Sequence, residues 1–296
     1  MFNKSFLTDK IVNSLVKRDF EVLVTEGCFN IAAKNESLML IKSLINVDGF
    51  SEEHALSLRS ISYFLSANPL VVSIKNNREF LTDQMIYSRF QLPVMTPSTF
   101  ENFIENSEMT FFESAKGKHT SEVDTEEIRN KRKEKGFSLR ELAQLLGISK
   151  KAMYEIEKKR TKPSSDTIAK IEKNLSIKIQ IAKNIETNLE PAYLKPKTET
   201  QKKVSKEFSR IGIDNSSVFS APFEIIGKEN FSVVTSSEAK ELSMMKKFAS
   251  IVSSKVFLMA KQTKKSSMGG VPIVSEEELS EMETPKDLKK TLREKV

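Results

Sequence analysis

Apolar and polar side chains alternate along the chain in patterns that separate three regions. Residues 1–110 combine strand-like apolar runs, such as Phe20–Thr25, with the helical spacing of apolar side chains over residues 52–66. Residues 124–175 have helical spacing throughout, and residues 206–283 return to the mixed pattern of the first region. We therefore expect two α/β regions on either side of an all-helical one.

Polar segments rich in Lys, Thr, Ser and Gln lie between these regions and predict linkers. At 296 residues the chain is long enough for two or three domains. The pattern predicts an α/β lobe at 1–110, a linker at 111–123, a helical domain at 124–182, a linker at 183–205, a second α/β lobe at 206–285 and a charged, frayed tail at 286–296.

The second lobe repeats the strand pattern of the first. Cys28–Lys34 aligns with Pro222–Lys228, and three further segments match in the same order, which favours an internal duplication over two unrelated domains. The predicted fold class is thus α+β multi-domain, with an all-α domain between two similar α/β lobes. The other matching segments are Leu38–Leu40 with Ser232–Val234, Pro69–Lys75 with Ser254–Lys261, and Leu92–Phe100 with Val271–Leu279.

The central region contains the start and stop signals of two short helices joined by a tight turn. Ser138, with Glu141 three residues later, forms a capping box at the start of an amphipathic helix. Gly147 ends that helix where a left-handed residue is needed, and Ser149 caps the next helix. These signals predict a helix-turn-helix, whose second helix at 149–159 would lie in the major groove of DNA.

Positive charge is concentrated in the same region. Residues 116–162 carry fourteen Lys or Arg and eight Asp or Glu, whereas the rest of the chain carries 33 and 32. Such a concentration is typical of a nucleic-acid-binding surface. A helical bundle with a solvated basic face, or a helix-turn-helix that binds protein, is the plainer alternative. We expect the loop after the second helix to contact phosphate through Lys158, Lys159, Arg160 and Lys162.

Composition argues against several other classes of protein. One cysteine (Cys28) and two histidines (His54 and His119) cannot form a disulfide framework or a Cys/His zinc site. We therefore expect no metal and no cofactor. No apolar run approaches the length of a membrane span, and the N-terminus lacks a signal-peptide pattern, so we expect a soluble, cytoplasmic protein that does not engage a membrane.

Residues 125–178 closely resemble the Cro/C1-type, phage-repressor-like helix-turn-helix. The resemblance rests on an Arg in the first helix, the Ser-x-x-x-Leu-Ala run from Ser138, the Gly-Ile-Ser turn and the apolar-x-x-apolar-Glu ending. The family often has Gln or Thr at base-facing positions where this chain has two lysines, so no target sequence is implied. The resemblance implies that Lys150, Lys151 and Glu155 face bases, that Ser138 and Ser149 meet phosphate, and that Arg132 pairs with Glu157 to tie the first helix to the recognition helix.

The whole chain is also similar to archaeal helix-turn-helix-type transcriptional regulators, in which a Leu-Ile-Lys strand like Leu40–Lys42 precedes the DNA-binding domain. This resemblance implies a sequence-specific regulator of transcription rather than an enzyme, with double-stranded DNA as its partner. Because the chain has one helix-turn-helix, we expect a homodimer, assembled through the α/β lobes, on a palindromic site. No effector ligand is indicated.

The lobes leave an enzymatic alternative open. The strand-turn-strand ending in Lys42 faintly resembles the core of the restriction-endonuclease-like fold, which holds Mg²⁺ with an acid on one strand and an acid-x-Lys pair on the next. Asn30 and Leu40 stand where the acids belong, and the second lobe has Glu224 but neither partner at Val234–Ser236. We expect a degenerate scaffold. The rival hypotheses are a nuclease or other DNA-processing enzyme, and an antitoxin-like scaffold that binds a protein.

Overall fold

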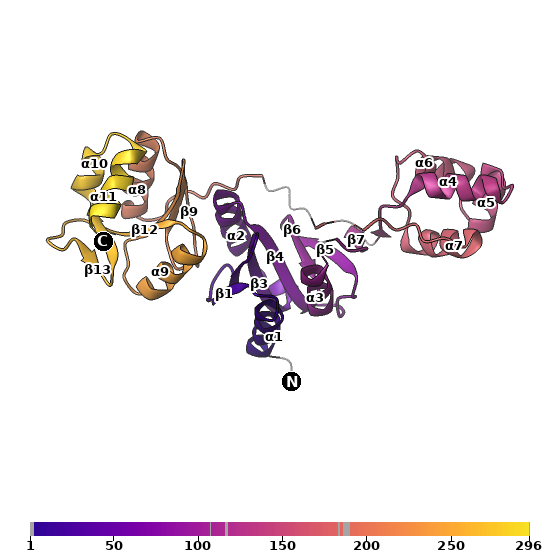
Figure 1. Ribbon diagram of the computed structural model, residues 1–296, viewed down its shortest axis with the longest axis horizontal. Helices are drawn as coiled ribbons and strands as arrows, with labels where there is room; N and C mark the ends of the chain where they lie inside the picture. Colours follow the sequence, from indigo (N-terminus) through magenta and orange to yellow (C-terminus); the bar gives the residue numbers. More distant parts are fainter. Residues whose placement is uncertain (1–2, 107, 116–117, 183, 186–189, 296) are drawn as a thin grey trace. The chain divides into compact units, whose positions relative to one another are not determined.

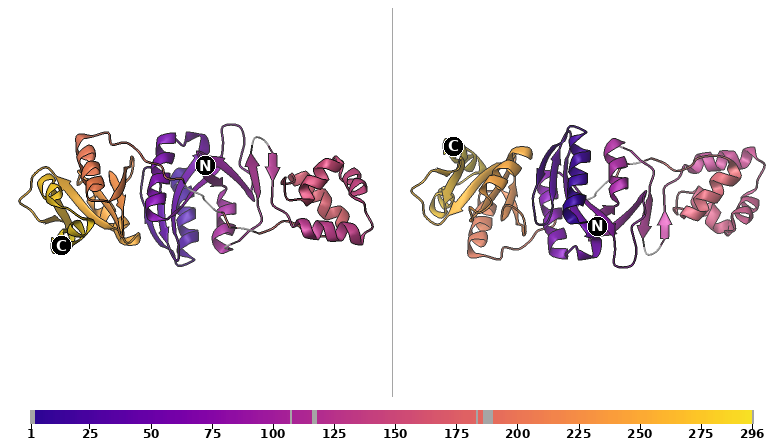
Figure 2. Two further views of the ribbon diagram at one scale, coloured as in Figure 1. Left: turned by 90° about the horizontal axis from the view of Figure 1, so that it is seen from above. Right: turned by 90° about the horizontal axis from the view of Figure 1, so that it is seen from below.

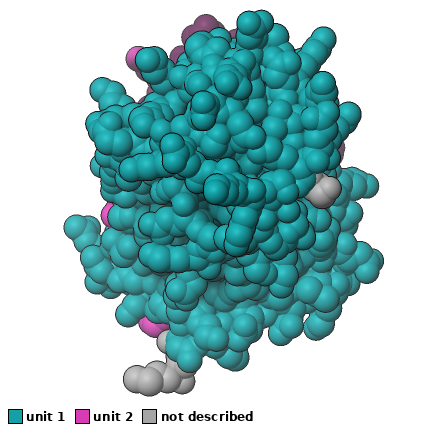
Figure 3. Space-filling model, turned by 90° about the vertical axis from the view of Figure 1, so that its left-hand side faces the viewer, with its two compact units in different colours: residues 1–79, 90–92, 187–296 teal, residues 80–89, 93–186 magenta. Residues whose placement is uncertain are grey.

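The computed structural model describes residues 3–106, 108–115, 118–182, 184–185 and 190–295 (Figure 1). These residues form two compact units (Figure 3). The first comprises residues 1–79, 90–92 and 187–296, and the second comprises residues 80–89 and 93–186. Among the helices of the described residues, none combines the length and apolar character that crossing a membrane requires.

The first unit contains most of lobe one, a mixed sheet with helices packed on it (Figure 2). Strands β1, β2 and β3 are antiparallel neighbours, and β4 runs parallel to β3. Ser51 caps α2 by accepting a hydrogen bond from the His54 N–H, and this helix crosses over from β3 to β4. The elements are α1 (Lys4–Val16), β1 (Glu21–Val24), β2 (Ile31–Lys34), β3 (Leu38–Asn46), a 3₁₀ turn (Val47–Gly49), α2 (Glu52–Leu65) and β4 (Asn68–Lys75).

Lobe two lies in the same unit and repeats this order of elements. Its sheet has the order β9-β10-β11-β12-β14-β13, with β9, β10 and β11 antiparallel and β12 parallel to β11. The fold class predicted from the sequence is confirmed, including two similar lobes. The elements are α8 (Glu199–Arg210), β9 (Asp214–Ser217), β10 (Ile225–Lys228), β11 (Ser232–Ser236), α9 (Leu242–Ile251), β12 (Lys255–Ala260), β13 (Ser267–Met268), β14 (Val271–Ser275), α10 (Glu276–Glu281) and α11 (Pro285–Glu294).

The likeness of the two lobes extends to single backbone hydrogen bonds. The Asn30 N–H donates to the Ile41 carbonyl over 2.8 Å at the start of β2. At the start of β10 the Glu224 N–H donates to the Thr235 carbonyl over 2.9 Å, with both partners offset by 194 residues. The two lobes can therefore be compared residue by residue, with Asn30 equivalent to Glu224.

The lobes pack on each other reciprocally within the unit. Helix α2 contacts β9 and β10 of lobe two, while α9 contacts β1 and β2 of lobe one. The Cys28 N–H donates to the Ser220 carbonyl over 2.6 Å, and the Phe219 N–H donates to Ser57 Oγ over 3.0 Å. Gly27 has φ +125°, and a Cβ there would lie 1.9 Å from the Ser220 oxygen. Glycine is therefore required at this contact.

The second unit continues lobe one into the helical domain. Strands β6 and β5 are neighbours, β7 runs parallel to β5, and β8 is antiparallel to β7. Four helices then enclose a core that includes Ile128, Leu142, Met153 and Ile171. The elements are β5 (Met85–Arg89), β6 (Leu92–Met95), α3 (Pro97–Glu105), β7 (Phe112–Ala115), β8 (Lys118–Thr120), α4 (Thr125–Glu134), α5 (Leu139–Leu146), α6 (Lys150–Glu157) and α7 (Ser165–Leu175).

The segments predicted to be linkers and tail are more ordered than their polarity suggests. Strands β7 and β8 lie within 111–123 because β7 extends the strands of lobe one, and α8 begins within 183–205. The expected frayed tail at 286–296 is helix α11, whose Leu288 and Leu292 pack into the core of lobe two. Residues 116–117, 183, 186–189 and 296, which fall in these segments, lie outside the described residues.

Candidate nucleic-acid interface

The turn between α5 and α6 has the geometry that the sequence predicts. Ser138 Oγ accepts a hydrogen bond from the Glu141 N–H over 3.2 Å, and Glu141 Oε2 accepts one from the Ser138 N–H over 2.7 Å. These bonds lower the pKa of Glu141. Gly147 adopts φ +70°, and Ser149 Oγ accepts from the Ala152 N–H over 3.0 Å. Both helix starts are therefore capped, and the left-handed residue stands between them.

Burial fixes which face of α6 points outward. Met153 and Ile156 are buried against Leu142 and Ala143 of α5 in the core of the helical domain. Since residues three and four apart share a helix face, the remaining side of α6 faces solvent. Lys150 and Lys151 are exposed on that side, in the first turn of the helix.

A buried ion pair ties α6 to α4. Arg132 Nε donates to Glu157 Oε1 over 2.7 Å, and Arg132 Nη2 donates to Glu157 Oε2 over 3.1 Å. Arg132 also donates to the Phe137 carbonyl over 2.9 Å, and Arg129 donates to the Glu157 carbonyl over 2.9 Å. Arg132 and Glu157 retain only 8% and 4% of their exposure. The structure thus brings together the two residues that the sequence resemblance pairs, and their bidentate contact orients α6 against α4.

Tyr154 belongs to the outward face of α6, although the sequence analysis did not single it out. Its side chain is 41% exposed, and the Lys158 ammonium and the Arg160 guanidinium lie 5.8 and 5.9 Å from its ring centroid. The sequence could have predicted this position, because residues three and four apart share a helix face and Tyr154 follows Lys150 by four residues and Lys151 by three. The outward surface therefore combines cations with one aromatic ring.

Three of the residues expected to contact DNA, Lys162, Glu155 and Arg160, are engaged with other side chains. Lys162 Nζ lies 2.9 Å from Glu113 Oε2 and 3.0 Å from Glu122 Oε1. Burial lowers the pKa of Lys162, but the hydrogen bonds to these two carboxylates raise this pKa by more, so it lies above its usual value. Its charge is therefore offset by two carboxylates, and its contact with phosphate stays a prediction. Glu155, expected to face bases, is half-buried and pairs with Arg160 at 3.5 Å.

Lobe one has a second polar centre at Asn30. Asn30 Oδ1 accepts a hydrogen bond from the Ser43 N–H over 3.1 Å, and at the equivalent place in lobe two Glu224 Oε2 accepts one from the Ser237 N–H over 2.7 Å. Position 30 is thus equivalent to position 224 in side-chain direction as well as in backbone. Both side chains are used to hold the next strand.

Lys42 is buried beside this centre and bonded to the backbone. Its exposure is 5%, and its ammonium donates to the Gly27 carbonyl in the loop that contacts lobe two. Burial lowers the pKa of Lys42 to about 8 and raises the pKa of neighbouring Cys28 to about 12. Leu40, two residues earlier, is fully buried. Within the described ranges, no three His, Cys, Asp or Glu side chains gather closely enough to hold a metal ion.

Comparison with known families agrees with the geometry of the central helices. Residues 128–181 match the helix-turn-helix family. The central domain is a Cro/C1-type helix-turn-helix. The match begins inside α4 and ends just after α7, so it covers the capped turn, α6 and both partners of the buried ion pair. The helix-turn-helix predicted from capping residues and apolar spacing is therefore confirmed.

The chain is similar along its length to archaeal proteins named "Putative HTH-type transcriptional regulatory protein". It is 25% identical over 296 residues to one from Methanothermobacter thermautotrophicus, covering 95% of this chain and 93% of that protein. It is 25% identical over 312 residues to one from Methanobrevibacter smithii, covering 100% and 99% of the two chains. A relative from Thermococcus kodakarensis is 28% identical over 291 residues, covering 91% of each chain.

Lobe one matches a second family. Residues 4–109 match the PD-(D/E)XK superfamily domain, which agrees with the restriction-endonuclease-like fold suggested by the strand pattern. The superfamily's name gives its motif. In the assignment made from the sequence, Asn30 and Leu40 stand at the positions of the two acids and Lys42 stands at the lysine, and this assignment stays a prediction. No solved structure gives a significant match to the chain.

Proposed function

We propose that this protein is a DNA-binding regulator of transcription that recognises specific sequences with α6 of its Cro/C1-type helix-turn-helix. The observation that carries the proposal is the outward face of α6. Lys150 and Lys151 lie exposed in its capped first turn, and Glu157 at its last residue fixes the same helix to α4. The names of the archaeal relatives support the same function.

The chemistry of this face suits duplex DNA. The N-terminus of α6 carries a partial positive charge from the helix dipole, and two lysines add full charges at the same end. Lysine in the first turn of a recognition helix can donate to guanine O6 and N7 in the major groove. Tyr154, one turn later, offers a ring and a hydroxyl to base edges or sugars, while Lys158 and Lys159 are exposed for phosphate contacts.

A homodimer is the proposed binding form. One helix-turn-helix buries a modest surface on DNA, and regulators of this type gain specificity by placing two recognition helices on half-sites about one helical turn apart. Each chain contributes one such helix, so a second chain is needed to supply the second helix. In this proposal the α/β lobes hold the two chains together.

Salt-dependent binding tests the assignment of α6. The variant Lys150→Ala/Lys151→Ala removes two cations from the outward face and should lower the slope of log affinity against log salt by up to about 2. Lys286→Ala/Lys290→Ala is the matched control, because it removes two exposed lysines from one face of α11 in lobe two. Fluorescence anisotropy on labelled duplex DNA measures both variants. Equal slopes for wild type and the α6 variant would refute the assignment.

The match to the PD-(D/E)XK superfamily supplies a second candidate function, cleavage of nucleic acid. We infer that lobe one does not perform it, since magnesium-dependent hydrolysis needs carboxylate ligands and this centre presents Asn30 and Leu40 instead. Lys42 is directed at the Gly27 carbonyl, where it braces a loop. Incubation of plasmid DNA with the protein and Mg²⁺ or Mn²⁺ should give no cleavage. Cleavage that disappears in Lys42→Ala would establish the enzymatic function.

A further inference from the structure

Lobe two carries a concentration of lysines that the chain's overall charge conceals. Residues 239–265, which span α9, β12 and most of the loop that leads to β13, contain seven lysines and one acid, Glu241. Outside residues 116–162 the chain is nearly neutral only because acids elsewhere, such as those of α10, balance this segment. The lobe-two basic surface is defined here by its exposed members, Lys240, Lys246, Lys247, Lys261, Lys264 and Lys265.

The duplication shows that the fold does not require these lysines. The equivalent segment of lobe one, residues 51–79, spans α2, β4 and the start of its loop and holds three basic and three acidic side chains. The same arrangement of helix and strand is therefore built in lobe one without excess charge. Clustered like charges repel one another and reduce stability. The lysines of lobe two thus call for an explanation in binding rather than in folding.

Helix α9, which carries Lys246 and Lys247, contacts the turn between β13 and β14. Lys246 Nζ donates to the Gly269 carbonyl over 3.1 Å, and a Cβ at Gly269 would lie 3.2 Å from Leu242 Cδ2. The turn between β13 and β14 therefore rests on α9. Lys261, Lys264 and Lys265 lie in the loop between β12 and β13, residues 261–266, which leads into this turn.

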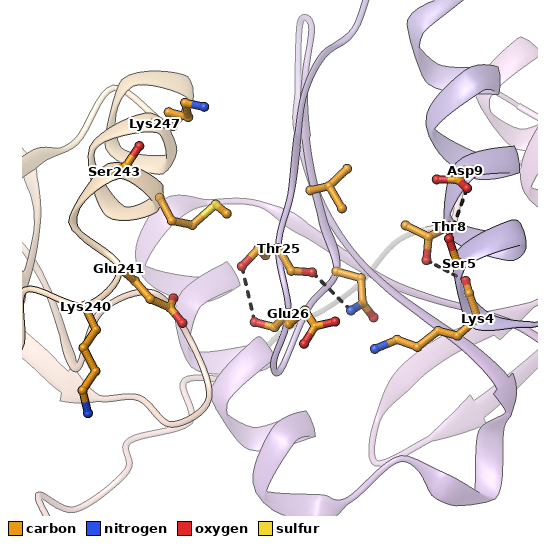
Figure 4. A pocket seen from close by; sticks show the side chains of 13 residues that line it. Lys4, Ser5, Thr8, Asp9, Thr25, Glu26, Lys240, Glu241, Ser243 and Lys247 are labelled. Carbon is orange, nitrogen blue, oxygen red and sulfur yellow. Dashed lines mark hydrogen bonds between the residues drawn. The ribbon is translucent and has the colours of Figure 1, made fainter.

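Almost none of this charge is neutralised within the described parts of the chain. Lys240 lies 3.2 Å from Glu238, and no other ion pair to a described residue involves these six lysines. Lys240 and Lys247 line a cavity of about 780 Å³ whose wall also includes Asp9, Glu26 and Glu241 (Figure 4). The charge around this cavity is mixed, whereas all the charged residues of the β12–β13 loop are lysines.

We propose that the lobe-two basic surface, and its β12–β13 loop above all, binds the phosphate backbone of the DNA that the helix-turn-helix engages. Lysine is a compact point charge, and solvated lysines over a rigid scaffold suit sequence-independent phosphate contacts. The helix-turn-helix supplies the partner, because a tethered second site meets bound DNA at about millimolar effective concentration. The proposal rests on the proposed function, and it assigns lobe two a positioning role without base recognition.

The variant Lys261→Ala/Lys264→Ala/Lys265→Ala tests this surface in the full chain. Loss of three phosphate contacts should lower the salt slope by about 3, so that wild type loses roughly 40 times more affinity than the variant between about 50 and 200 mM salt. The matched control is Lys286→Ala/Lys290→Ala/Arg293→Ala on α11. There seven acids and four basic residues share the segment 276–294, so the slope should not change.

The outcomes separate this proposal from the function of α6. The triple variant of the β12–β13 loop should bind every duplex more weakly while selecting the same sequences as wild type. An unchanged salt slope overturns the phosphate contact, and it is also the result expected if the surface binds an acidic protein instead. If the loop variant lowers the slope but Lys150→Ala/Lys151→Ala does not, the lobe-two contact stands and the proposed role of α6 fails.

Discussion

Replacing Glu157 by Gln should destabilise the helix-turn-helix severely, because it leaves Arg132 buried without a counter-charge. The Glu157 side chain is 5% exposed and Arg132 is 10% exposed, so water cannot replace the lost carboxylate. Removing one partner of a buried ion pair typically costs about 3–5 kcal/mol. The whole stability of a domain of this size is about 3–8 kcal/mol. The substitution should therefore bring the domain close to unfolding.

Glu155→Gln is the matched control for this substitution. Glu155 also lies on α6 and also pairs with an arginine, but its contact with Arg160 is 3.5 Å long, and the side chains are 26% and 62% exposed. Exposed pairs contribute less than about 1 kcal/mol. The two variants thus remove the same charge from the same helix and differ in burial.

Native-state hydrogen exchange of the full chain is the suitable assay, because it reports each unit separately. Glu157→Gln should lower the protection of amides in α4 to α7 by at least about 100-fold, as expected for roughly 3 kcal/mol or more. Protection in lobe two should not change. The double variant Arg132→Leu/Glu157→Leu should recover much of the loss, since it removes both charges. Equal protection in Glu157→Gln and Glu155→Gln would refute the buried ion pair as the tie.

Three further predictions concern the lobes, each measured by thermal or chemical denaturation. Gly27→Ala should destabilise the first unit by more than about 3 kcal/mol, because the new Cβ collides with the Ser220 carbonyl. Gly212→Ala is the comparison: its Cβ would meet open space, so only the backbone strain at φ +85° remains, which should cost about 1–2 kcal/mol. Burial lowers the pKa of Lys42 to about 8, so between pH 8 and 10.5 the unfolded chain binds more protons than the folded chain. The free energy of unfolding should therefore rise by up to about 3 kcal/mol across this range, and Lys42→Met should abolish the rise. Leu288→Ala should lower the free energy of unfolding by about 2–5 kcal/mol, because Leu288 of α11 is buried in the core of lobe two. A negligible change in this free energy would favour the frayed tail that the sequence predicts.

The helix-turn-helix was predictable because its determinants are local. Ser138, Glu141, Gly147 and Ser149 act within one or two turns of themselves, and the apolar spacing between them selects the buried face. Helix α1 escaped prediction, although Leu7, Ile11 and Leu15 recur every four residues on its buried face.

Contacts between distant segments lay beyond what the sequence shows. Nothing near Lys162 predicts that Glu113 and Glu122 will meet it, since pairing of β7 with β5 and β8 brings those carboxylates into place. The requirement for glycine at position 27 likewise arises from Ser220 in the other lobe. The positive charge of residues 239–265 can be counted in the sequence. It is hidden when the charge of all residues outside 116–162 is summed, because acidic residues elsewhere cancel it.

Selection from random duplexes by the purified full chain tests the central claim most directly. Wild type should recover a two-fold-symmetric motif with half-sites about one helical turn apart, as two recognition helices on one face of DNA require. Lys150→Ala/Lys151→Ala should lose that motif, while Lys286→Ala/Lys290→Ala keeps it. Recovery of no motif by wild type, or of the same motif by the α6 variant, would contradict the assignment of α6 as the recognition helix of a transcriptional regulator.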